Sequence, residues 1–143
     1  GNFYNNLPEC DKDWCEITDG KNFFDYNERV DLVIGNPPYS LWSKWLDHTA
    51  KLTDKFCYIF GMMNFTDFRL KQIEEKGFGL TIAHIVKVDW WFSQSIIAVF
   101  ERNKKSIITT SIRVKCECGV RCNRGTKGYS ANDCSPKEKR ITR

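Results

Sequence analysis

The sequence contains no signal peptide and no apolar run long enough to cross a membrane. Internal repeats and low-complexity segments are also missing, so a repeat architecture is excluded. The first two absences leave a secreted or membrane role without support, and we expect a cytoplasmic protein. What remains is a chain of 143 residues with ordinary globular composition, which suits one domain with a small appendage.

The seven cysteines lack the even number expected of a secreted disulfide framework. Four of them cluster near the C-terminus: Cys116, Cys118, Cys122 and Cys134. Four thiolates suffice for a tetrahedral structural zinc site, although the C-x-C-x3-C-x11-C spacing departs from paired C-x-x-C knuckles. The alternative is a set of reduced thiols in a flexible tail, and the spacing leaves both interpretations open.

The net charge of +4 is distributed unevenly along the chain. Residues 1–101 carry 10 basic and 15 acidic side chains, a net charge of −5, whereas residues 102–143 carry 12 basic and 3 acidic ones, a net charge of +9. An acidic body with a basic tail is typical of a protein with a polyanionic partner such as DNA. A solvated charged tail is the alternative, and nothing in the sequence indicates an oligomeric state.

Hydrophobic periodicity predicts alternating strands and helices in residues 1–101. Strands are expected at residues 13–18, 30–34, 56–60, 80–88 and 95–101, and helices at residues 40–52 and 66–76. The alternation favours an α/β fold with a parallel sheet, and the short connection between the last two strands predicts an antiparallel hairpin at its edge. The hydrophobic periodicity ends near Arg102, and the sequence that follows is rich in basic residues and cysteine. We therefore expect a domain at residues 1–101 and a small basic, Cys-rich extension at residues 102–143.

A Gly-Asn-Pro-Pro-Tyr string follows the expected strand at residues 30–34, at the edge where open α/β sheets bind ligands. Pro37 and Pro38 fix the backbone and remove two N–H donors. The Asn36 side chain and the Pro37 carbonyl then offer two neutral acceptors, which suit the two N–H donors of an exocyclic amine. The ring of Tyr39 can stack on the heterocycle that carries this amine. A plain strand-to-helix turn is the alternative.

These residues resemble motif IV of the S-adenosylmethionine-dependent amino-methyltransferases, the (Asp/Asn/Ser)-Pro-Pro-(Tyr/Phe) loop. In that family the loop holds the target nitrogen of a flipped base. The resemblance implies a Rossmann-like methyltransferase sheet, S-adenosylmethionine as cofactor, and methyl transfer to N6 of adenine in DNA. It also implies a bacterial, archaeal or phage enzyme, as in restriction–modification systems. Cytosine-N4, RNA and protein-glutamine methyltransferases remain alternatives, as does a non-catalytic remnant that binds nucleic acid.

Other segments follow the order of the same family. Glu16 lies where the family places an acid that binds the ribose hydroxyls of the cofactor. Asn22 and Phe23 lie where it places an adenine acceptor and a packing ring, although an Asp is usual at the position of Asn22. Phe92, or Trp91 as a second choice, lies where an aromatic residue contacts the flipped base. A surface acid and core packing are the alternatives for these residues.

The Phe-x-Gly-x-Gly cofactor loop of the family does not occur in this sequence. The stretch that begins at Gly1 resembles the segment that follows such a loop, so Gly1 is the residue of this motif that we expect to be present. The resemblance therefore implies an incomplete sheet, with weak or absent cofactor binding and activity. Because the later motifs follow one another directly, any DNA-reading region is expected on the C-terminal side, as in the gamma arrangement of the family.

Overall fold

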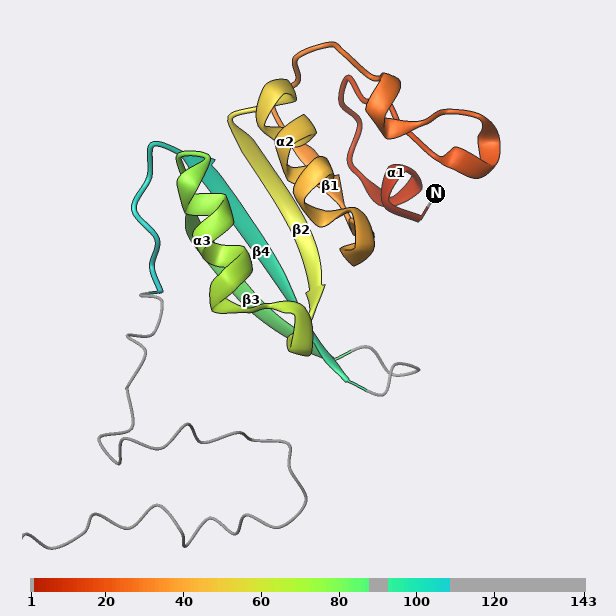
Figure 1. Ribbon diagram of the computed structural model, residues 1–143. Coiled ribbons are helices and arrows are strands. Elements are labelled where there is room, and N and C mark those ends of the chain that lie inside the picture. Colours follow the sequence, from red (N-terminus) through yellow and green to blue (C-terminus); the bar gives the residue numbers. More distant parts are fainter. Residues whose placement is uncertain (1, 88–92, 109–143) are drawn as a thin grey trace, which may run out of the picture. The chain divides into compact units, whose positions relative to one another are not determined.

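The computed structural model describes residues 2–87 and 93–108, which form an open sheet with helices packed against it (Figure 1). The helices are α1 (Asn2–Asn6), α2 (Trp42–Leu52) and α3 (Asp67–Glu75), and the strands are β1 (Val33–Gly35), β2 (Lys55–Gly61), β3 (Phe78–Lys87) and β4 (Gln94–Arg102). Short 3-10 turns lie at η1 (Ile17–Asp19), η2 (Phe23–Asp25), η3 (Tyr39–Leu41) and η4 (Met62–Asn64). In these ranges no helix is both long and apolar enough to span a membrane.

The strands lie in the order β1-β2-β4-β3. β1 runs parallel to β2, with α2 as the connection between them, whereas β4 is antiparallel to both of its neighbours. The predicted α/β, Rossmann-like sheet with an antiparallel edge hairpin is therefore confirmed. In this hairpin β3 forms the edge, and β4 lies between β3 and β2.

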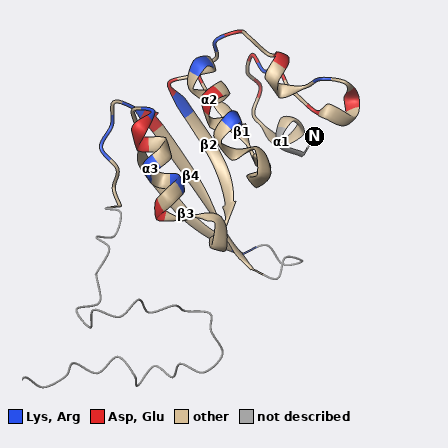
Figure 2. Ribbon diagram, in the orientation of Figure 1, with Lys and Arg blue, Asp and Glu red and all other residues tan. Residues whose placement is uncertain are grey.

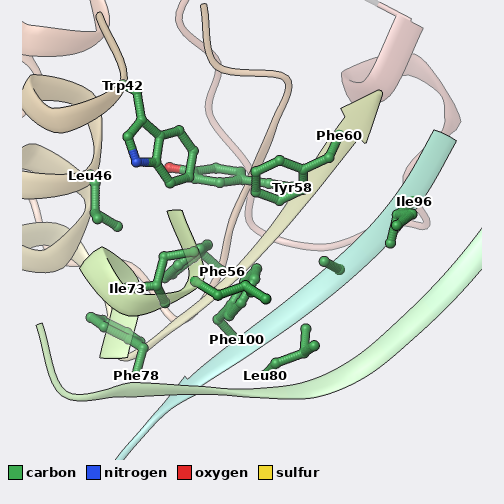
Figure 3. Packing of buried hydrophobic residues seen from close by; sticks show 12 residues of the cluster. Trp42, Leu46, Phe56, Tyr58, Phe60, Ile73, Phe78, Leu80, Ile96 and Phe100 are labelled. Atoms are coloured by element: carbon green, nitrogen blue, oxygen red, sulfur yellow. The ribbon is translucent and has the colours of Figure 1, made fainter. Parts of the chain in front are cut away.

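The hydrophobic core lies between one face of the sheet and the helices α2 and α3 (Figure 3). Phe56, Tyr58 and Phe60 alternate along β2 and are fully buried on this face. Phe56 stacks on Phe100 of β4, with ring centroids 4.9 Å apart and planes inclined by 23°. Burying aromatic rings contributes most of the stability of such a core, and it holds the carboxyl ends of β1 and β2 in one place.

Helix α2 forms because its apolar residues recur every three or four positions. Trp42, Leu46, Thr49 and Leu52 are buried, and this spacing places them on one side of a helix. The Thr49 hydroxyl forms a hydrogen bond with the Tyr58 hydroxyl beneath it. Burial raises the pKa of Tyr58, so the phenol stays neutral. The helix is thereby fixed over β2, and its first turn lies directly after the Asn-Pro-Pro-Tyr loop.

Residues 103–108, which we call the edge strap, continue along β3 after β4 ends. The Ile107 N–H donates to the Leu80 carbonyl at 2.9 Å, and the Ser106 hydroxyl accepts from the Leu80 N–H at 3.1 Å. The strap passes so close to Gly79 that a Cβ there would collide with the strap backbone. These bonds satisfy backbone groups that an edge strand otherwise exposes.

Two details of the predicted secondary structure are wrong. Residues 13–18 do not form a strand, because the Asp13 carboxylate accepts a 2.7 Å bond from the adjacent Trp14 N–H and a 3-10 turn follows. Glu16 consequently ends no strand. The strand expected at residues 30–34 pairs only over Val33–Gly35, and it is half-buried because β2 is its one partner in the described part of the sheet.

Candidate functional site

The Asn-Pro-Pro-Tyr loop leaves the sheet at Gly35, the last residue of β1, and so lies at the carboxyl edge as expected. The Pro37 ring is fully buried and anchors the loop, whereas Asn36 and Pro38 are exposed. The Pro38 carbonyl accepts a 3.0 Å bond from the Leu41 N–H, which begins the turn that leads into α2. Rigid backbone on both sides therefore fixes the position of this loop.

The two predicted amine acceptors remain available. Within the described residues, neither the side chain of Asn36 nor the carbonyl of Pro37 takes part in a hydrogen bond. The next carbonyl along, that of Pro38, is used by the turn into α2. A neutral acceptor that is left free at the carboxyl edge of a sheet is suited to a ligand with N–H donors.

Tyr39 joins the loop to the neighbouring strand. Its hydroxyl accepts a 2.8 Å hydrogen bond from the N–H of Gly61, the last residue of β2. β1 ends opposite Tyr58, and β2 continues beyond it to Gly61, so the loop that follows β1 runs beside the last residues of β2. Stacking of Tyr39 on a base stays a prediction, whereas its contact with Gly61 is a structural role that the sequence did not indicate.

Arg69, in the first turns of α3, is a site residue that the sequence did not reveal. Its guanidinium lies 5.0 Å from the centroid of the Tyr39 ring and 5.7 Å from that of Trp42. Nη1 donates a 2.9 Å bond to the carbonyl of Asn64 in the turn after β2. One face of the Tyr39 ring is thus taken by a cation, and a base could stack only on the opposite face. The sequence offered one indication of this position: α3 follows β2, so its first residues are expected at the carboxyl edge of the sheet, where the Asn-Pro-Pro-Tyr loop also lies.

A cavity of about 300 Å³ opens between the starts of α2 and α3. We call it the Lys44–Arg69 pocket. Its lining combines cationic, hydroxyl and aromatic side chains: Tyr39, Ser40, Leu41, Trp42, Ser43, Lys44, Phe68 and Arg69. Because Tyr39 belongs to both, the pocket adjoins the Asn-Pro-Pro-Tyr loop.

Of the described residues that were expected to bind S-adenosylmethionine, only some have side chains that are free to contact it. The Glu16 side chain is exposed and unbonded within the described residues, so it can accept from ribose hydroxyls. The Asn22 amide oxygen already accepts from the Phe24 N–H at 3.2 Å. Phe23 is half-buried and stacks on Trp45 of α2, with centroids 4.3 Å apart, so one face of this ring is already occupied. These residues do not make a complete cofactor cradle by themselves.

The remaining predicted site residues lie outside the described ranges: Gly1, Trp91, Phe92, Cys116, Cys118, Cys122 and Cys134. Among the residues that the structure does describe, no group of three or more His, Cys, Asp or Glu side chains could hold a metal ion. The zinc site therefore stays a prediction, as does base stacking by Phe92.

Comparison with protein-family models gives no match, and comparison with curated protein sequences gives none either. Among solved structures, the chain is similar to a candidate RNA methyltransferase, PH1948 from Pyrococcus horikoshii, with a TM-score of 0.47 and 22% identity over 57% of this chain and 48% of that one. It is also similar to M1.HpyAVI in complex with S-adenosylmethionine, with a TM-score of 0.44 and 15% identity over 65% of this chain and 54% of that one.

A second structure of M1.HpyAVI gives a TM-score of 0.44 and 22% identity, over 63% of this chain and 51% of that one. The chain thus spans about half the length of each of these structures. At these scores and identities the likeness assigns no activity, so the function has to be argued from the site itself.

Proposed function

We propose that this chain belongs to an amino-methyltransferase that acts on N6 of adenine in DNA, and that the Asn-Pro-Pro-Tyr loop binds the target amine. One observation carries the proposal. The loop lies at the carboxyl edge of β1 and is tied to β2 through the bond from the Gly61 N–H to the Tyr39 hydroxyl. At the same time, the acceptors of Asn36 and Pro37 take part in no hydrogen bond with the described residues.

The chemistry asked of these residues is binding and orientation. The two N–H groups of the amine donate to the Asn36 side-chain oxygen and to the Pro37 carbonyl, and this leaves the nitrogen lone pair directed away from the loop. S-adenosylmethionine, when bound, supplies an activated methyl group on its sulfonium. A neutral acceptor suffices for the loop because the methyl group is already activated, and Tyr39 keeps the heterocycle in place by stacking.

DNA adenine is the substrate favoured by the basic extension at residues 102–143, which can contact phosphates. Cytosine N4, RNA bases and protein glutamine carry comparable amines and are the alternatives. A non-catalytic protein that binds nucleic acid is a further candidate. It is favoured by one observation, because Asn22 and Phe23 are engaged in capping and packing rather than left open for a cofactor.

The amine interaction can be tested without requiring turnover. A single-stranded DNA of thymines with one central adenine is compared with the same strand carrying N6,N6-dimethyladenine, which has no N–H to donate. Fluorescence anisotropy should show roughly thirtyfold weaker binding of the dimethylated strand, as expected for the loss of two hydrogen bonds worth about 1 kcal/mol each. Asn36→Ala should remove much of this difference, whereas the control Asn5→Ala, also exposed, should keep it. Equal binding of the two strands by the wild type would contradict the proposal.

Catalytic competence is a separate question. Transfer of label from S-adenosylmethionine to DNA, RNA or a release-factor-like protein identifies the substrate class in a protein that carries the cofactor loop. For the present chain we expect weak cofactor binding, because Glu16 is the one described cofactor residue with a free side chain. Calorimetric titration with a micromolar dissociation constant would overturn that expectation and would argue against the non-catalytic alternative.

A further inference from the structure

The Lys44–Arg69 pocket contains cations that no acid neutralises within the described residues. Several other basic side chains of the helices and the sheet have acidic partners, as in the pairs Lys71–Asp67, Lys76–Asp47 and Lys55–Glu101. Lys44 and Arg69 instead contact aromatic rings, and the Lys44 ammonium lies 4.2 Å from the centroid of the Phe24 ring. Figure 2 shows both basic and acidic residues along α2 and α3. Lys44 and Arg69 both line the cavity and no described acidic residue does, so its lining carries a net positive charge.

Arg69 also has hydrogen-bonding capacity that the protein does not use. Nη1 is occupied by the Asn64 carbonyl, but Nε is buried and has no acceptor in the described part of the chain. A buried donor of a guanidinium without a partner is uncommon, because leaving it unsatisfied costs free energy. The described residues therefore leave the hydrogen-bonding capacity of this guanidinium partly unused.

We propose that the Lys44–Arg69 pocket binds a phosphodiester group of the nucleic acid, next to the nucleotide whose amine is held by the Asn-Pro-Pro-Tyr loop. The inference rests on the proposed function for the identity of that neighbouring site. The planar guanidinium of Arg69 suits the paired oxygens of a phosphate, and Lys44 adds a point charge. The hydroxyls of Ser40 and Ser43 line the same cavity and can donate to phosphate oxygens.

The arrangement of Tyr39 supports this assignment. Arg69 occupies one face of the Tyr39 ring, so a target base stacks on the other face and the cation lies beyond the ring. A strand that continues past the edge of Tyr39 would reach the pocket, because Tyr39 also lines it. Phe68 is 65% exposed at the rim and offers an aromatic surface for the adjoining base. Tyr39 thus lies between the neutral Asn-Pro-Pro-Tyr loop, which would bind the amine, and the cationic pocket, which would bind the phosphate.

The test is a binding cycle with the full 143-residue chain. The probes are a fluorescent thymine strand with one adenine and the same strand with uncharged methylphosphonate linkages on both sides of that adenine. The wild type should bind the uncharged strand more weakly, and this difference between the two strands should be smaller in Lys44→Gln, which keeps Arg69. The slope of log affinity against log salt should become shallower by about 0.7 in the variant, because one phosphate fewer is neutralised. Arg69→Gln should behave like Lys44→Gln, and Arg69→Lys should restore part of the slope.

Lys71→Gln is the matched control, since Lys71 lies on α3 but is paired with Asp67. It should leave the linkage effect unchanged. Lys44 is exposed, so its variant tests the proposal even where Arg69→Gln unfolds the loop. The proposal is overturned when Lys44→Gln changes the slope no more than Lys71→Gln does, or when neutral linkages weaken the wild type and the variant equally. Either failure leaves the discrimination between adenine and dimethyladenine intact, whereas failure of the proposed function abolishes that discrimination first.

Discussion

The hydroxyl of Tyr39 gives the sharpest test of how the loop is held. Tyr39→Phe removes the acceptor for the Gly61 N–H, a bond of 2.8 Å, and keeps the ring that lies against Arg69. The expected effect is on the position of the loop rather than on stacking. The variant therefore separates the two roles of this residue, which a truncation to alanine would remove together.

The magnitude follows from the burial of the donor. A hydrogen bond of this kind contributes about 0.5–1.5 kcal/mol, and a fully buried unsatisfied donor costs more. Gly61 is half-buried, so water replaces the missing acceptor in part, and we expect the free energy of unfolding to fall by about 1 kcal/mol. With urea dependences of about 1–3 kcal/mol per molar, the midpoint of unfolding moves down by roughly 0.3–1 M.

Urea unfolding followed by tryptophan fluorescence measures this shift. Tyr26→Phe is the control, because Tyr26 is also half-buried and its hydroxyl forms no hydrogen bond within the described residues. Removal of an unbonded hydroxyl in Tyr26→Phe should change the free energy of unfolding by no more than about 0.5 kcal/mol. If both variants unfold at the same urea concentration, the bond from Gly61 does not hold the loop. Stacking of a base on this residue should survive in Tyr39→Phe, because the ring remains.

Three further outcomes follow from other contacts. Gly79→Ala should lower stability by roughly 1–3 kcal/mol, because its Cβ would displace the edge strap, and an unchanged melting temperature would contradict this close approach. A hydrogen bond from the Arg102 guanidinium lowers the pKa of Asp54, so this stabilisation is present above the usual aspartate pKa of about 3.9 and is lost as the pH falls through the lower folded value. In Asp54→Asn the free energy of unfolding should accordingly fall less steeply as the pH is lowered. The same steepness in the variant and the wild type would show that the Asp54 carboxylate does not cause this loss of stability. Burial raises the pKa of Cys57, so at a pH of about 8 iodoacetamide should label the exposed Cys10 first, with equal labelling in peptide mapping as the contrary result.

Local patterns account for the parts of the fold that the sequence predicted. The helix at α3 was expected at residues 66–76 from its amphipathic pattern, and in the structure Thr66 caps its first turn while Gly77, with a positive φ, follows its end. The loop was predicted at the carboxyl edge because two prolines after a β-branched run can continue neither a strand nor a helix. Such features depend on neighbours within a few residues, so one sequence suffices to read them.

Contacts between distant segments were not predictable in this way. Nothing near Arg69 in the sequence indicates that its guanidinium lies over Tyr39, thirty residues earlier. The Asp13 side chain bonds its own backbone region and prevents the expected strand, although the apolar pattern there is strand-like. Periodicity reports which face of an element is apolar, but it does not report whether a partner strand exists.

The position of β4 between β2 and β3 has a consequence for how the sheet is assembled. β2 has only the three residues of β1 as a partner among the described strands that precede it, so most of its backbone stays unpaired until β4 has been synthesised. The β3–β4 hairpin is the most local pairing, and β2 then docks against a ribbon that already exists. We therefore expect the C-terminal hairpin to nucleate folding and the Asn-Pro-Pro-Tyr loop to reach its final position late, when Gly61 meets Tyr39.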